Sequence, residues 1–168
     1  MRLYGRPLPV LGQLISQAIG GWLPTLALFS LPMAFLSPLL GVSLRSASPW
    51  FLLSLFLCVS LGFAIDILFA CLSIRLRNMN WLISRIRAAI VALLSGTVIP
   101  IRFLPPGFRE IVQYQPFASL GGAPLSLFVG AADPIGVLWL QAAWNIILWP
   151  ITLFVFKKSQ EGMVSYGG

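Results

Sequence analysis

The chain has 168 residues, of which 58% are hydrophobic and only 9% are charged. Soluble domains average about 45–50% apolar and about 25% charged residues, so this composition predicts a multi-pass protein of the cell membrane. With no histidine and only four acidic residues, the sequence excludes a Ser-His-Asp triad and a histidine-ligated metal site. It also lacks a phosphate-binding loop of the form G-x-x-x-x-G-K-[ST], so we expect a chain that is not itself an enzyme and holds no cofactor.

Residues 1–21 are predicted to form a cytoplasmic lead-in to the membrane. Apolar residues recur from Leu11 to Ile19 with the spacing of one helix face, and Pro9 is placed to begin that helix. We therefore expect a short amphipathic helix lying in the membrane interface.

Four apolar stretches have the roughly 17–25 residues that a transmembrane helix needs. The sequence thus predicts an all-α, polytopic membrane helical bundle, forming a single membrane domain over residues 1–168. The first stretch contains three prolines and is expected to be kinked. The predicted transmembrane segments are residues 22–41, 50–74, 82–101 and 135–156.

The segment between the last two stretches, residues 102–134, is long yet hardly hydrophilic. After Pro105, helical spacing from Phe108 to Gln115 predicts a short outer helix. Residues 117–129 are apolar and interrupted by glycine and proline, so we expect a re-entrant or interfacial segment that packs on protein. Together they predict an outer, partly re-entrant helical hairpin.

Lysine and arginine distribution predicts the orientation. Cytoplasmic termini place eight basic residues inside and three outside, which is the arrangement that the positive-inside rule favours. The inner set is Arg2, Arg6, Arg75, Arg77, Arg85, Arg87, Lys157 and Lys158, and the outer set is Arg45, Arg102 and Arg109.

Asp66 is the one acidic residue inside a predicted transmembrane segment. A carboxylate there requires a partner, and equal rise along an antiparallel helical hairpin places position 66 level with positions 87 and 88. We expect Asp66 to pair with Arg87 or with Arg85. The pair would either clamp two helices or lie beside a substrate path.

The C-terminal half carries a set of glycines, prolines and aromatic residues in a specific order, which are Gly96, Pro100, Phe103, Pro105, Pro116, Phe117, Pro124 and Gly130. An Arg6-Pro7 pair precedes the first transmembrane segment, and two lysines and a terminal Gly-Gly follow the last one. This order resembles the membrane permeases of ABC exporters in which a permease pairs with a separate ATPase (the class-2 ABC permease superfamily).

The resemblance implies a permease subunit that forms a substrate path with a second permease, identical or different, as a dimer. Arg2, Tyr4, Arg6 and Pro7 then become candidates for coupling to the ATPase, which would bind ATP and Mg²⁺. Residues 104–130 would form the external cap. Such permeases have six transmembrane segments, so residues 1–168 would correspond to the last four.

Two other classes remain open. A small membrane scaffold or assembly subunit would bind other membrane proteins and need no ATPase. An ion- or proton-coupled carrier would use Asp66, although it lacks a second titratable partner in the predicted membrane segments. We expect lipid around the chain and no nucleic acid partner.

Overall fold

The computed structural model describes residues 10–41, 46–76, 79–96, 98–99 and 101–164. These residues form six α-helices and one 3₁₀ turn, with no strand among them, which confirms the all-α prediction. The chain divides into two compact units, Met1–Arg45 and Ser46–Gly168. Each unit is described by itself.

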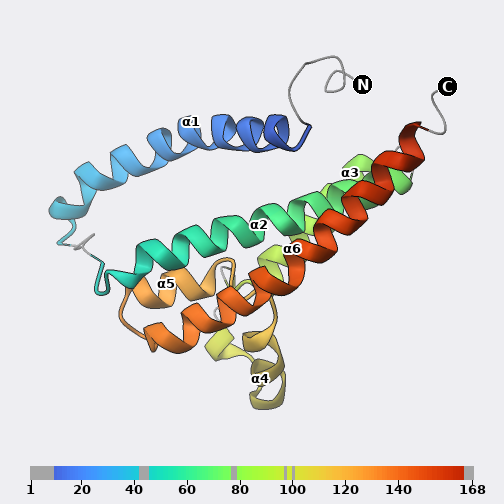
Figure 1. Cartoon of the computed structure of the whole chain (residues 1–168). Coiled ribbons are helices and arrows are strands. Elements are labelled where there is room, and N and C mark those ends of the chain that lie inside the picture. The colour runs from blue at the N-terminus through green and yellow to red at the C-terminus, as the bar shows by residue number, and fades with distance from the viewer. Residues whose placement is uncertain (1–9, 42–45, 77–78, 97, 100, 165–168) are drawn as a thin grey trace. The chain divides into compact units, whose positions relative to one another are not determined.

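The first unit contains one long helix, α1 (Val10–Leu39). The expected interfacial helix and the start of the first predicted transmembrane segment are therefore continuous, which corrects the prediction of two separate elements. Pro24, Pro32 and Pro38 all lie inside α1, and the helix changes direction along its course (Figure 1). This bend is expected, because each internal proline removes one backbone hydrogen bond and crowds the preceding turn.

The second unit is built around α2 (Trp50–Arg75). Its sequence is apolar and free of internal proline, and it coincides with the second predicted transmembrane segment. The last helix, α6 (Pro134–Val164), covers the fourth predicted segment. Asp133 caps its start, since its Oδ2 accepts a hydrogen bond from the Gly136 N–H at 2.9 Å.

Helices α2 and α6 are long and apolar enough to cross a membrane, and they are the two such helices found among the described residues. Only 28% of the residues in the apolar window of α2 and 11% in that of α6 are buried. Exposed side chains such as Leu52, Phe56, Ile146 and Phe154 are large and apolar. A helix buried in a soluble core would have the opposite pattern.

The third helix, α3 (Asn80–Leu94), is shorter than predicted. The sequence predicted a transmembrane segment over 82–101, but the helix ends seven residues earlier. Gly96 explains this end, because its backbone adopts a left-handed φ of +75° that terminates a helix. The chain then forms the 3₁₀ turn η1 (Ile101–Phe103).

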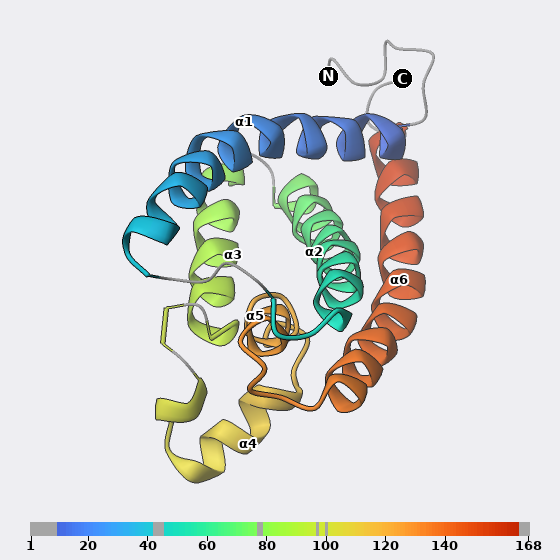
Figure 2. The same cartoon turned by 90° about the vertical axis from the view of Figure 1, so that its left-hand side faces the viewer.

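Two short helices complete the second unit, α4 (Pro106–Tyr114) and α5 (Gly122–Phe128). Helix α4 lies where the outer helix was predicted. Helix α5 packs on α2 (Figure 1), and its buried residues include Pro124 and Leu127. Viewed from the side, α2 lies between α3 and α6 (Figure 2). Because α2 is central, each of its two flanks contacts a different helix, α3 on one side and α6 on the other.

Candidate functional site

One flank of α2 carries the predicted intramembrane ion pair. Arg87 Nη2 of α3 forms a salt bridge with Asp66 Oδ1 of α2. The short connection between the two helices makes them an antiparallel hairpin, which brings these positions to the same level. Arg85, the other candidate, instead lies over the Trp81 ring, with its guanidinium carbon 5.6 Å from the ring centroid. The geometry therefore selects Arg87 over Arg85 as the partner of Asp66.

A cavity of about 310 Å³ lies beside this ion pair. Both charged side chains remain accessible there, at 39% for Arg87 and 42% for Asp66. The cavity joins charged, hydroxyl and apolar groups from two helices. Its lining residues are Asp66, Phe69, Ala70 and Ser73 of α2 and Ile83, Ser84 and Arg87 of α3.

The other flank of α2 meets α6 through a row of neutral hydrogen bonds, which we call the polar seam. Each donor is a side chain of α6, and each acceptor is an oxygen of α2. The bonds join Gln141 Nε2 to Ser54 O (3.3 Å), Asn145 Nδ2 to Leu57 O (3.1 Å), Trp149 Nε1 to Ser60 Oγ (2.9 Å) and Thr152 Oγ1 to Ala64 O (3.2 Å).

The polar seam shows that α2 and α6 run in the same direction, because the residue numbers of the bonded partners increase together along the two helices. Gln141 and Thr152 are completely buried, and Asn145 nearly so. The sequence interpretation missed this row, although a signal was present. Positions 141, 145, 149 and 152 follow the spacing of one helix face, and Gln141, Asn145 and Thr152 are the polar, non-aromatic residues of the stretch 135–156.

The segment of the outer-cap motif is held against both long helices. Backbone carbonyls of Tyr114, Ser119 and Leu120 accept hydrogen bonds from Trp144 Nε1 (2.8 Å), Gln141 Nε2 (2.9 Å) and Cys58 Sγ (2.6 Å) respectively. Irregular backbone is tolerated at membrane depth only where its polar groups are satisfied in this way. The last residue of α4 and the non-helical stretch that follows it meet that condition at these three carbonyls.

The same segment also caps the end of α3. Gln115 Nε2 donates to the carbonyl of Leu94 at 3.0 Å, and the Gly122 N–H donates to that of Ser95 at 3.0 Å. A Cβ on Gly122 would lie 3.1 Å from the Ser95 oxygen, so a glycine suits this approach. At the early end of α3, the carbonyls of Leu94 and Ser95 are thus satisfied by residues of the outer segment.

The remaining motif residues occupy turns and packed positions of this segment. Pro105 immediately precedes α4 and, like Phe103, is exposed. Pro116 and Phe117 are half-buried in the turns between α4 and α5, and Pro124 is buried in α5. Gly130 has a φ of +70° and ends the segment, with Ala47 Cβ 3.0 Å from where its own Cβ would lie.

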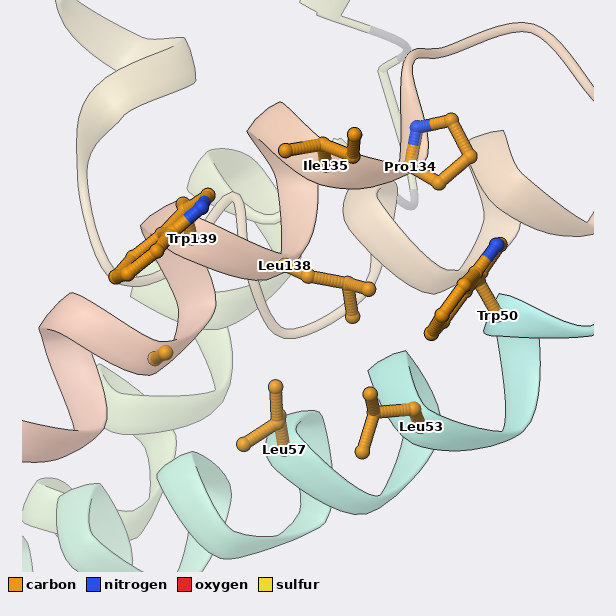
Figure 3. Close-up of a pocket in the computed structure, with 8 residues that line it drawn as sticks. Trp50, Leu53, Leu57, Pro134, Ile135, Leu138 and Trp139 are labelled. Carbon is orange, nitrogen blue, oxygen red and sulfur yellow. The ribbon is translucent and has the colours of Figure 1, made fainter.

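A second cavity, of about 340 Å³, lies between the first turns of α2 and α6 (Figure 3). Trp50 and Trp139 lie on either side of it, with Leu138 between them (Figure 3). Its surroundings are almost entirely apolar, so it can accommodate an apolar group but offers no chemistry. The lining residues are Trp50, Leu53, Leu57, Pro134, Ile135, Leu138, Trp139 and Ala142.

Several predicted site residues lie outside the described part of the chain. These are Pro100 of the outer-cap motif and the candidates for ATPase coupling, Arg2, Tyr4, Arg6 and Pro7. Their proposed roles stay predictions.

A comparison of the sequence and the structure with known proteins finds no relative. No protein-family model, no curated protein sequence and no solved structure matches this chain.

Proposed function

We propose that this chain is a transmembrane permease subunit of an ATP-driven ABC exporter, acting with a separate ATPase. The observation that carries the proposal is the packing of the 95–130 segment. Helix α5 of this segment packs on α2, and side chains of α2 and α6 hold the segment in place. A fixed, partly non-helical cap over a helical bundle is the feature that the resemblance to such permeases leads us to expect.

Membrane insertion is the first part of the proposal. Helices α2 and α6 have the length and the exposed apolar surface of transmembrane helices. We propose that residues 22–41 and 82–101 supply two further crossings. Helix α3, with 15 residues, is about 22 Å long at 1.5 Å per residue, shorter than the roughly 30 Å hydrocarbon core. Local thinning of the bilayer would accommodate it.

The proposed orientation places both termini in the cytoplasm. The parallel course of α2 and α6 requires the chain to return between them, and α3 provides that return. Lys157, Lys158 and Arg75 then lie near the cytoplasmic ends of the two long helices, and Arg109 of α4 lies outside. This distribution follows the positive-inside rule.

Transport itself would follow from motion of two packed permeases driven by the ATPase. ATP and Mg²⁺ would be bound by that partner, and this chain would supply a path and the docking residues Arg2 and Arg6. A protein without catalytic groups of its own is sufficient for this role.

The proposal is tested by purifying the tagged full chain from its native membranes and identifying stoichiometric partners by mass spectrometry. We expect an ATPase with a phosphate-binding loop to co-purify, and an Arg2→Glu, Arg6→Glu double variant to lose at least tenfold of it. Arg109→Glu is the matched control, because the same charge reversal on the proposed outer side should leave the ATPase bound.

Recovery of other membrane subunits without any ATPase would contradict the exporter proposal. That outcome would favour the scaffold function instead. Loss of the ATPase from the Arg109→Glu control, at normal protein levels, would contradict the proposed orientation.

A further inference from the structure

We propose that the cavity beside Asp66 and Arg87 binds the headgroup of a phospholipid carrying both a phosphate and a primary ammonium. In this arrangement the ammonium pairs with Asp66 and the phosphate with Arg87. The inference rests on the membrane placement proposed above, but it does not depend on an ATPase partner or on transport.

The depth of the cavity matches that of a lipid headgroup. With Trp50 at one boundary of the roughly 30 Å hydrocarbon core, a rise of 1.5 Å per residue places the other boundary near Ala70. The α2 residues lining the cavity, from Asp66 to Ser73, lie on both sides of that boundary. Asp66 is then about 6 Å, or one helical turn, inside it.

Residues of α3 give independent evidence that the cavity lies at the membrane interface. Trp81 is 71% exposed, and Arg85 lies over its ring. An exposed tryptophan beside an arginine is typical of the headgroup region. Since Arg87 is only two residues further along, its guanidinium can reach lipid phosphates.

The paired charges select a ligand that is itself zwitterionic. An anion alone would separate Arg87 from Asp66 and leave the carboxylate unpaired near hydrocarbon, and a cation alone would do the same to the guanidinium. A headgroup with both charges replaces one ion pair by two.

The lining favours a primary over a quaternary ammonium. A primary ammonium donates hydrogen bonds to a carboxylate, whereas a trimethylated one has no N–H. Recognition of quaternary ammonium groups usually requires a cage of aromatic rings, and among the described residues that line this cavity Phe69 is the one aromatic. The volume of about 310 Å³ is at the lower end of ligand pockets, as a small headgroup requires.

The test uses the purified full chain in detergent, titrated with dioctanoyl-phosphatidylethanolamine, dioctanoyl-phosphatidylcholine or dioctanoyl-phosphatidylglycerol. A ligand that binds the folded state raises the thermal unfolding midpoint, and a tighter ligand does so at a lower concentration. We expect phosphatidylethanolamine to bind at least tenfold more tightly than the other two. Asp66→Asn should abolish this preference, and Arg87→Gln should weaken binding of all three lipids.

Arg85→Gln is the matched control and should retain the preference, because Arg85 is not among the residues lining the cavity. Asp66→Glu keeps the charge and should retain it within threefold. Equal affinity for the three lipids in the wild-type chain would overturn the proposal even if every variant failed to fold. Tighter binding of phosphatidylglycerol, or a preference that survives Asp66→Asn, would also overturn it.

Discussion

The two flanks of α2 are joined to their neighbours by opposite kinds of chemistry. Toward α6, neutral side chains donate hydrogen bonds to α2 oxygens along the polar seam, and the donors Gln141 and Thr152 are completely buried. Toward α3, the charged pair Asp66–Arg87 is about 40% exposed and opens onto a cavity. The polar seam is closed along most of its length, whereas the ion pair is accessible.

This difference separates what holds the helices together from what can meet a ligand. Inside a membrane, helix association cannot rely on the hydrophobic effect, so packing and interhelical hydrogen bonds must provide it. The polar seam fits that requirement over about three helical turns of α2. The Asp66–Arg87 pair is too accessible for a main clamp, because exposed ion pairs contribute little to stability.

The largest expected effect comes from the centre of the polar seam. Gln141→Leu removes the hydrogen bonds to the carbonyls of both Ser54 and Ser119, and so loosens α6 from α2 and from the outer segment. We expect the free energy of unfolding to fall by about 1–3 kcal/mol. Loss of the Gln141 Oε1 atom, which is buried without a hydrogen bond, offsets part of this cost.

The measurement is SDS-induced unfolding of the purified chain, with Gln113→Leu as the matched control. Gln113 lies on an exposed position of α4, so the same substitution there should change stability by less than about 0.5 kcal/mol. If the two variants unfold alike, the polar seam does not hold α2 and α6 together.

An intermediate effect is expected at the far end of α3, away from the ion pair. Gly96→Ala forces a side chain onto a backbone with a φ of +75°, and its Cβ would lie 2.9 Å from Ile101 Cγ1. A left-handed backbone costs a non-glycine residue about 1–2 kcal/mol. We expect stability to fall by that amount.

Gly107→Ala is the control for this glycine substitution. No atom of the described residues lies within 4 Å of a Cβ added at Gly107, and the residue is helical, so alanine should leave stability unchanged or slightly higher. Equal behaviour of the two alanine variants would mean that the end of α3 is not fixed by the conformation of Gly96.

Periodic and compositional features of the fold were predictable from the sequence. The long apolar runs located α2 and α6, and helical spacing after Pro105 located α4. The ion pair was also predictable, because helical rise alone determines which residues of an antiparallel hairpin are level. Such features depend on near neighbours in the chain.

Features that depend on distant partners were not predictable. The predicted transmembrane segment ran to residue 101 because apolar residues continue past Gly96. Hydropathy carries no information on the left-handed backbone of a glycine, which ends α3 at Leu94. The polar seam was not predicted, because in the sequence Gln141 and Asn145 are isolated polar residues. Their role depends on the position of the α2 carbonyls that accept their hydrogen bonds.

The smallest effect on stability is expected from the ion pair, and it completes the comparison of the two flanks. Asp66→Asn and Arg87→Gln should each lower the free energy of unfolding by less than about 1 kcal/mol, since both side chains are partly exposed and, in the proposed placement, lie within about one helical turn of the headgroup region, where water reaches the remaining charge. The swapped Asp66→Arg, Arg87→Asp double variant should recover most of that loss in the same SDS assay. If either single variant lowers stability as much as Gln141→Leu does, the ion pair is a structural clamp. If the double variant is no more stable than either single variant, the two charges do not interact. A small, recoverable loss would instead leave the carboxylate and the guanidinium available to a ligand, which is what a headgroup site at this cavity requires.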